Sequence, residues 1–408
     1  MKKEHYIPFD KEVLIHKLIK ENNYDKQQSK QLFKLFEIIE HYFHYEGFSF
    51  NKIIKKNYVF FDPERTKEEL AGFHGIANLE EFKESLNIVL KRGNYSEVDH
   101  DTLDDALVSD DLIGLQLKIN FDYFKEYKVY CRGVDQYKET VRHRYFWKKE
   151  KDFETFERVI IYIQYKDKEY FDSKKINIEK LSFRPSTIIL KTFKRVPKND
   201  IETIFPNANP VMSLKDKLLL WVPALGGGIP MLTTKVLPPV FAMYAAYKTG
   251  ESSSSDNIKK PLIQGLIALG LIAAYLFRQY KRFLTKKIEF SKMLSDSLYF
   301  KNIANNSGVF PALIEAAEEE EIKETILAYT ILLNSKEKLS TKELDRTIED
   351  WFAKTYNKDI DFDVEDALNK LKRLEIGKEE NGKWGVIPIN EALLKIDGIW
   401  DNIFKYNN

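Results

Sequence analysis

The spacing of apolar residues predicts helices over most of the first hundred positions. Within Gln27–Phe43, apolar side chains recur at the three- and four-residue intervals of a helix face. Leu79–Lys91 and Asp101–Leu107 are further helix candidates. Between the first two of these helices, Tyr58–Phe61 is predicted as a buried aromatic strand or loop that ends at Pro63. We therefore expect a helical N-terminal region over residues 1–110.

Strand character begins near Leu112. In Leu115–Phe121 every second residue is apolar, which is the period of a strand with one buried face. Lys166–Lys168 predicts a tight turn before a short strand at Glu169–Phe171. Three longer β-rich runs are Lys128–Gly133, Glu157–Tyr165 and Ser186–Arg195. Together they predict an α+β domain with a mainly antiparallel sheet over residues 111–210.

Two apolar segments then predict a transmembrane hairpin over residues 211–290. Leu218–Tyr247 and Leu262–Phe277 are nearly free of charge, and the polar loop 248–260 separates them. The second segment has close to the minimum length of a spanning helix, roughly 17 residues; a buried core helix is its alternative. The first contains prolines, glycines and Lys235, so a re-entrant or surface-attached segment is its alternative.

Flanking charge sets the predicted orientation of this hairpin. Lysines precede it, and a basic stretch from Arg278 to Lys287 follows it, whereas the loop holds Lys248, Lys259 and Lys260 alone. Since positive residues favour the cytoplasmic side, both termini are predicted to be cytoplasmic.

After the hairpin the chain returns to amphipathic helices. We expect a helical connector over residues 291–336, in which Glu318–Glu321 forms a solvated acidic turn. From Ser340 the predicted order is helix, helix, hairpin and helix. Ser340 with Glu343 forms a capping-box pattern, and Asn381-Gly382 is a strong hairpin-turn signal. The order predicts a winged-helix-like domain over residues 337–408.

Charge argues against nucleic-acid binding by this domain. Residues 340–408 hold 11 Lys or Arg and 15 Asp or Glu, a net charge of −4, and the whole chain has a net charge of +1. A protein that binds a nucleic-acid duplex needs positive charge to neutralise phosphates. Protein interaction is therefore the expected role of residues 337–408.

Composition adds few constraints on chemistry. Cys131 is the single cysteine, which excludes an internal disulfide. The first residues lack the uninterrupted apolar core of a signal peptide. His41 and His44 lie beside two glutamates but match no complete ligand pattern, so an amphipathic helix is expected there. No metal site and no cofactor is predicted.

Several composite motifs resemble the transmembrane protein 143-like family, a domain of unknown function. They lie in the expected order across most of residues 58–333 and are Tyr58–Glu64 (YVFFDPE), Asn94–Leu107, Gly114–Gly133, Leu190–Pro206, Leu298–Lys301, Asn306–Gly308 and Glu321–Tyr329 (EIKETILAY). The resemblance implies a membrane protein with paired apolar segments. It implies no established activity and no catalytic residues.

Three functional hypotheses follow from the sequence. The first is a two-pass membrane scaffold or sensor, with the bilayer, a protein partner or another copy of the hairpin as its partner. The second is an enzyme that acts on lipid headgroups, and the third is an oligomeric pore. Basic and aromatic residues alternate over Arg142–Lys149, as in a headgroup-binding or nucleic-acid-binding patch, although a solvated strand face explains them as well. The candidate functional residues are Asp62, Glu64, Arg132, Arg142, His143, Arg195 and Lys235.

Overall fold

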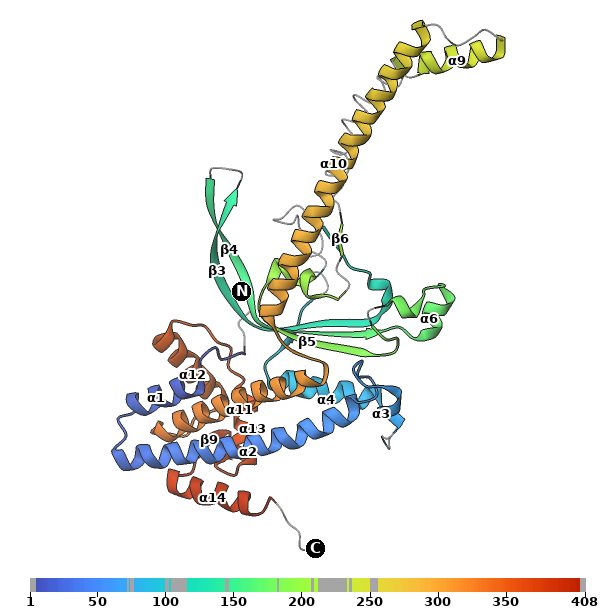
Figure 1. Ribbon diagram of the computed structural model, residues 1–408. Coiled ribbons are helices and arrows are strands. Elements are labelled where there is room, and N and C mark those ends of the chain that lie inside the picture. Colours follow the sequence, from blue (N-terminus) through green and yellow to red (C-terminus); the bar gives the residue numbers. More distant parts are fainter. Residues whose placement is uncertain are drawn as a thin grey trace. The chain divides into compact units, whose positions relative to one another are not determined.

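The computed structural model describes residues 5–71, 73, 77–99, 103, 116–143, 147–181, 183–206, 209–211, 233–234, 237–249 and 256–403. The chain divides into two compact units. Unit 1 comprises Met1–Thr102, Phe121–Lys198 and Lys301–Asn408, and unit 2 comprises Leu103–Asn120 and Asn199–Phe300. Figure 1 labels the helices and several of the strands.

Long helices form one layer of unit 1, where α1 (Lys11–Glu21), α2 (Lys26–Tyr58) and α11 (Val309–Asn334) lie side by side (Figure 1). Asp25 and Gln28 form a capping box at the start of α2. The side chain of each residue accepts a hydrogen bond from the backbone amide of the other, which satisfies two free donors at the helix start. The short helix α3 (Lys67–Ala71) and the helix α4 (Leu79–Arg92) complete the N-terminal region. The predicted helices at 27–43 and 79–91 are thus present, and α2 is longer than expected. Of the predicted helix 101–107, only Leu103 belongs to the described residues.

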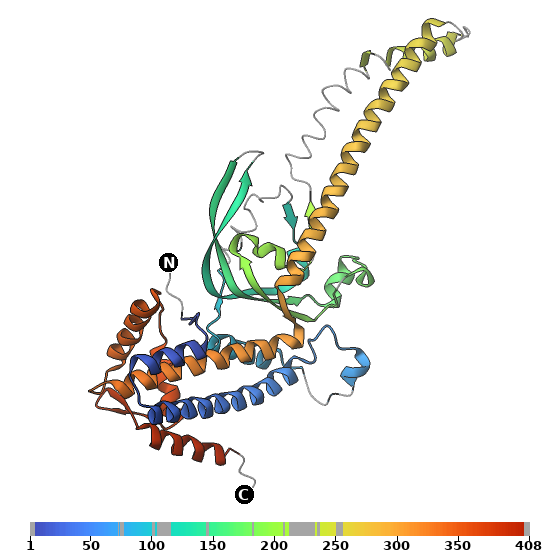
Figure 2. The ribbon, with the colours of Figure 1, turned by 60° about the vertical axis from the view of Figure 1, so that its left-hand side comes forward.

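An antiparallel sheet of five strands is the other layer of unit 1 (Figure 2). Its strand order is β1-β3-β4-β5-β7. The longest pair, β3 (Phe124–His143) and β4 (Trp147–Tyr165), forms a hairpin that closes at the His143 and Trp147 pair. The other strands are β1 (Ser96–Glu97), β5 (Ile188–Pro197) and β7 (Asn302–Asn305). The predicted α+β class with an antiparallel sheet is confirmed.

The C-terminal region of unit 1 has the predicted order of elements. It contains α12 (Thr341–Tyr356), α13 (Val364–Arg373), the strands β8 (Gly377–Glu380) and β9 (Lys383–Val386), and α14 (Ile389–Asp401). Asn381 and Gly382 both adopt positive φ, as a tight hairpin turn requires. These helices share a hydrophobic core with α1, α2 and α11, to which Leu18, Phe36, Leu327, Leu344 and Leu371 contribute.

The described residues of unit 2 include a two-stranded sheet and the helices α9 (Leu237–Thr249) and α10 (Asp256–Lys301). In the sheet, strand β2 (Gln116–Lys118) pairs with β6 (Asn209–Val211).

The predicted transmembrane hairpin is wrong. Among the residues that the structure describes, no helix is long and apolar enough to cross a membrane. Helix α9 has 13 residues, fewer than the roughly 17–25 that a span requires. Helix α10 has 46 residues, but its uncharged part, Leu262–Phe277, stops at Arg278 and a strongly charged half follows. The two-pass membrane localisation with cytoplasmic termini, which rested on these segments, is corrected with it.

One local prediction also differs from the structure. Glu169–Phe171 belongs to the helix α6 (Lys168–Ser173), which begins after Asp167, and not to a strand, so a helix start overrides the β propensity of its aromatic residues. Of Tyr58–Phe61, predicted as a buried strand or loop, Tyr58 is the last residue of α2 and the other residues form the turn that follows, so the loop alternative holds for them. The Tyr58 hydroxyl donates to the carbonyl of Ile188 at 2.7 Å.

Close packing of α2 on α11 depends on Gly47. A Cβ atom there would lie 1.9 Å from Glu318 Oε1 and 2.8 Å from Ile314 Cγ2. We expect Gly47→Ala to destabilise the protein by about 1–3 kcal/mol, because the buried Ile314 methyl has nowhere to move. Chemical denaturation measures this change. The matched control is Gly398→Ala on α14, where a Cβ meets nothing within 4 Å. It should stabilise α14 by about 0.5–1 kcal/mol, and equal effects of the two variants would contradict the packing argument.

Candidate functional site

The most unusual feature of unit 1 is a set of charged side chains buried on α11. Glu320, Glu321, Lys323 and Glu324 have exposed fractions of 0%, 5%, 2% and 2%. The sequence predicted a solvated acidic turn here, which is wrong for this face of the helix. Charged residues are almost never fully buried unless they are paired. We call these four residues, with Arg92, Asn94 and Lys370, the buried charge network.

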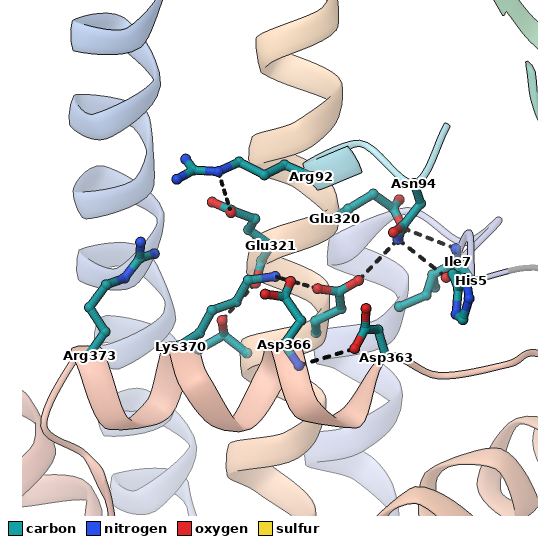
Figure 3. Close-up of polar contacts among 12 residues, drawn as sticks. His5, Ile7, Arg92, Asn94, Glu320, Glu321, Asp363, Asp366, Lys370 and Arg373 are labelled. Carbon is teal, nitrogen blue, oxygen red and sulfur yellow. Dashed lines mark hydrogen bonds and ion pairs between the residues drawn. The ribbon is translucent and has the colours of Figure 1, made fainter. Parts of the chain in front are cut away.

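Lys370 enters the buried charge network from α13 (Figure 3). Its side chain is 4% exposed and pairs with Glu324, and its Nζ lies 2.7 Å from Asp366 Oδ2. Arg92, at the end of α4, contributes a second cation, with its Nε 3.6 Å from Glu321 Oε1. The pairs therefore join α4, α11 and α13.

Asn94 and Lys323 extend the buried charge network to the N-terminal segment. The Asn94 Nδ2 atom donates to Glu320 Oε2 at 3.2 Å and to Glu324 Oε1 at 3.0 Å. Lys323 Nζ lies 2.6 Å from Glu320 Oε1 and donates to the carbonyl oxygen of Ile7 at 2.8 Å. Figure 3 shows Asn94 beside Glu320, with Ile7 and His5 close by. Residue 94 has positive φ, a conformation that asparagine tolerates better than most residues.

Burial controls the protonation of this network. It raises the pKa of Glu324 to about 7, against the opposing effect of Lys370. It also raises the pKa of Glu321 and of Glu318. For Lys370, burial lowers the pKa, but the carboxylates of Glu324, Glu321 and Asp366 outweigh it and the net pKa is raised. Lys370 therefore carries its charge at neutral pH, whereas Glu324 is close to its titration point.

Arg132 is a predicted site residue that the structure buries nearby. It is 6% exposed, and its guanidinium donates to the carbonyls of Gly93 at 3.2 Å and Ala316 at 3.4 Å. The same group lies over the rings of Tyr6 at 4.7 Å and Tyr95 at 5.0 Å. Its partners are thus backbone carbonyls and aromatic faces, which hold a guanidinium without needing a substrate.

Asp62 and Glu64 belong to a separate cluster, at the turn that follows α2. Asp62 is 2% exposed and accepts a bond from the Glu64 amide at 3.0 Å, and burial raises its pKa. Arg184 donates to the Asp62 carbonyl at 2.8 Å. Asn306 donates from Nδ2 to Glu64 Oε1 at 2.6 Å. Among the described residues, this cluster has no hydrogen-bond partner in common with Arg132, and its bonds order the turn.

Of the other predicted residues, Arg195 is the one whose side chain the structure describes. Arg195 is exposed on β5 with a φ of 51°, at a point where the β4 and β5 pairing skips a residue. Arg142 and His143 lie in β3, at the far end of the β3 and β4 hairpin. Lys235 lies outside the described residues. That these residues are functional stays a prediction.

In the part of the chain that the structure describes, histidines and potential metal ligands form no further cluster. His44 Nδ1 lies 3.1 Å from Glu318 Oε2, which is a single ion pair if His44 is protonated. Within the described ranges, no group of three or more histidine, cysteine, aspartate or glutamate residues could hold a metal ion. The buried charge network itself mixes cations with carboxylates and so neutralises internally the charge that would attract a metal.

Comparison with known families gives one match. A family model described as a protein of unknown function (DUF3754) matches residues 156–308. The match runs from β4 to Asn306–Gly308 and does not reach the α11 residues of the buried charge network. Nothing links the chain to a transmembrane protein 143 family, so the coarser part of the predicted resemblance, a domain of unknown function, is what holds. No solved structure matches the chain.

The amino-acid sequence carries only one weak signal of the buried charge network. Its members come from positions 92–94, 320–324 and 370, and helical periodicity assigns charged residues to the solvent face. The one available signal was the position of the charged run Glu318–Glu324 in α11 between apolar residues, Ala316 and Ala317 before it and Ile326–Ala328 after it. Chemically, the network holds four helical and loop segments in fixed positions, because each charge depends on a partner from another segment.

Removal of the Lys370 charge tests how far the buried charge network depends on its pairing. At pH 8, above the pKa of about 7 of Glu324, we expect Lys370→Met to lower the free energy of unfolding by about 3–5 kcal/mol, because the buried Glu324 carboxylate would lose its partner. Chemical denaturation measures the loss. Asp366→Asn is the matched control; that carboxylate is 47% exposed, so the effect should stay within about 1 kcal/mol. Glu324→Leu combined with Lys370→Met should recover most of the stability, and a double variant no better than Lys370→Met would contradict the pairing.

The raised pKa of Glu324 predicts a pH dependence. Its ordinary pKa is 4.5 and its folded pKa about 7, so between these values the folded chain keeps a proton that the unfolded chain has lost. Stability from this carboxyl is therefore full below pH 4.5 and is lost as pH rises through about 7. Denaturation curves at pH 5 to 8 should show a smaller decline with pH in Glu324→Gln than in the unaltered chain. Parallel declines would show that Glu324 is already ionised in the folded state.

Proposed function

We propose that the chain is a non-enzymatic interaction protein whose C-terminal region, residues 337–408, binds a protein partner. The observation that carries this proposal is the position of the basic residues of α13. Lys370 is buried against α11, and Arg373 NH2 lies 3.2 Å from Glu46 Oε2 of α2. A helix that reads DNA presents such residues outward to phosphates and base edges.

What α13 leaves at its surface has little net charge. Its exposed residues are Glu365, Asn369, Lys372 and Arg373, and Arg373 is paired with Glu46. The neighbouring β8 and β9 hairpin exposes Lys378, Glu379 and Lys383. With a regional net charge of −4, electrostatic complementarity favours a protein surface with basic residues over an anionic polymer.

The dispersal of the other candidate residues also supports interaction over catalysis. Asp62 and Glu64 are used in one turn, and Arg132 is held by carbonyls and aromatic rings elsewhere. A catalytic centre needs its acid, base and binding groups to converge on one reacting atom. Among the described residues these candidates do not converge.

Photo-crosslinking tests the proposal directly. A photoreactive residue placed at Asn369 or Lys383 of the full chain should give a discrete protein adduct in cells, identified by mass spectrometry. The same residue at Lys52, exposed on α2, is the positional control. Glu365→Lys with Glu379→Lys should reduce the adduct at least fivefold, because both reverse charge on the proposed surface. Glu84→Lys, an exposed change on α4, should leave it unchanged.

A DNA-binding titration tests the alternative that residues 337–408 bind a DNA duplex. In a fluorescence-anisotropy titration at low salt, the full chain should show no saturable binding of a short duplex. Saturable, strongly salt-dependent DNA binding, or the absence of protein adducts at both α13 and the hairpin, would overturn the proposal.

A further inference from the structure

The segment His5–Phe9, which we call the strap, crosses unit 1 without forming a helix or strand. Its backbone is held by charged side chains of α11. The Ile7 amide donates to Glu320 Oε2 at 3.1 Å, and Lys323 Nζ donates to the carbonyls of Ile7 at 2.8 Å and Phe9 at 3.2 Å. Such bonds depend on backbone groups, which every peptide carries.

The side chains of the strap occupy distinct positions along its path. Ile7 is fully buried in the core. The Tyr6 ring lies under the Arg132 guanidinium, 4.7 Å away, and 5.5 Å from Lys323 Nζ. The Phe9 ring stacks on Tyr356 of α12, with centroids 4.0 Å apart and an interplanar angle of 26°. These positions select an aromatic, an aliphatic and a second aromatic residue.

Together the contacts have the form of extended-peptide recognition. In known cases, bonds to the peptide backbone supply affinity and separate side-chain positions supply specificity. Here the buried charged side chains of α11 form the hydrogen bonds to the peptide backbone that the edge strand of a sheet forms in those cases. Bonds to charged groups are about twice as strong as neutral ones, so three of them hold a short segment firmly.

We propose that Arg132, Glu320, Lys323 and Tyr356 form a binding site for an extended peptide with the pattern aromatic, aliphatic, proline, aromatic, and that the strap is its occupant in cis. A protein segment with this pattern binds the site by displacing the strap. This site lies apart from the C-terminal surface proposed above, so the two proposals stand or fall separately.

The chemistry of the empty site favours a new occupant. Without a strap, Glu320 and Lys323 lose their backbone partners, and buried polar groups are costly when unpaired. Arg132 Nε already lacks a hydrogen-bond partner within the described structure, so the site keeps a spare donor. Next to it, Gly133 has a φ of 68°, and a Cβ there would lie 3.1 Å from the Tyr6 ring. The absence of this Cβ leaves room for an aromatic residue of the occupant.

A competition experiment tests the proposal in the full chain. The strap is weakened in place by Ile7→Asp and Phe9→Ser, and the probe is a fluorescent synthetic peptide with the sequence of residues 5–12. Because a tethered segment competes at high effective concentration, the peptide should bind the altered chain at least tenfold more tightly than the unaltered chain. A peptide carrying the same two substitutions should not bind. Equal binding to both chains, or no binding to a folded altered chain, would overturn the proposal.

A matched pair of site variants distinguishes specific stacking from general stickiness. In the weakened-strap chain, Tyr356→Ala should reduce peptide affinity at least tenfold because it removes the ring under Phe9. Tyr356→Phe should retain the affinity, since the ring remains. Equal affinities for the two variants would place the peptide elsewhere and refute the site.

Hydrogen exchange tests the proposal in the unaltered chain, so it does not require that the altered chain folds. In the unaltered chain, the Ile7 amide should exchange at least tenfold faster than that of Leu327 in α11, because strap release is a local opening. Addition of excess free peptide should speed the exchange of the strap amide by occupying the opened site. If Ile7 exchanges only as slowly as the core of α11, the strap is an integral part of the fold and the proposal fails.

Discussion

The constraint on which unit 1 depends is the burial of charge on α11. Glu320 and Glu324 are out of contact with water, and Lys370 is inserted beside Glu324 from another helix. Taking an ion from water costs several kcal/mol even after the protein relaxes, and a single partner rarely repays this. The arrangement therefore needs α4, α13 and an extended segment at the place of the strap to supply its partners. One row of side chains thus fixes the positions of four segments.

This constraint limits what the C-terminal region can do. In a winged-helix-like arrangement, the second of the two helices would be the one that enters a DNA groove. Here α13 is tied to α11 through Lys370 and to α2 through Arg373, so two of its three basic residues are engaged in ion pairs within the protein, while Lys372 is exposed. The C-terminal region therefore has the order of elements of a DNA-binding module without a cluster of unpaired positive charge on α13. Protein binding fits what is left at the surface.

Local sequence signals predicted local structure well. The capping box of Ser340 and Glu343 and the turn at Asn381-Gly382 depend on neighbours within a few residues, and the sequence shows both. The buried charge network depends on residues up to 278 positions apart, as between Arg92 and Lys370, which no local pattern reveals. The prediction of a transmembrane hairpin over residues 211–290 was wrong for a related reason. A stretch of apolar composition gives no information on the length and charge of the helix in which it lies, and Leu262–Phe277 turned out to be part of the 46-residue helix α10.

The same long-range contacts bear on cooperativity. Asn94 donates to the His5 carbonyl and to Glu324, and Glu324 pairs with Lys370, so a single chain of polar contacts runs from the strap to α13. Contacts of such sequence separation form only after much of the chain has been ordered, since loop closure must precede them. Neighbouring members of one polar network also respond to change as a group and not independently. Displacement of the strap would therefore alter the surroundings of Glu320 and Glu324, and through Glu324 the helix α13. In this way a peptide bound at one face of unit 1 could influence the C-terminal surface without touching it.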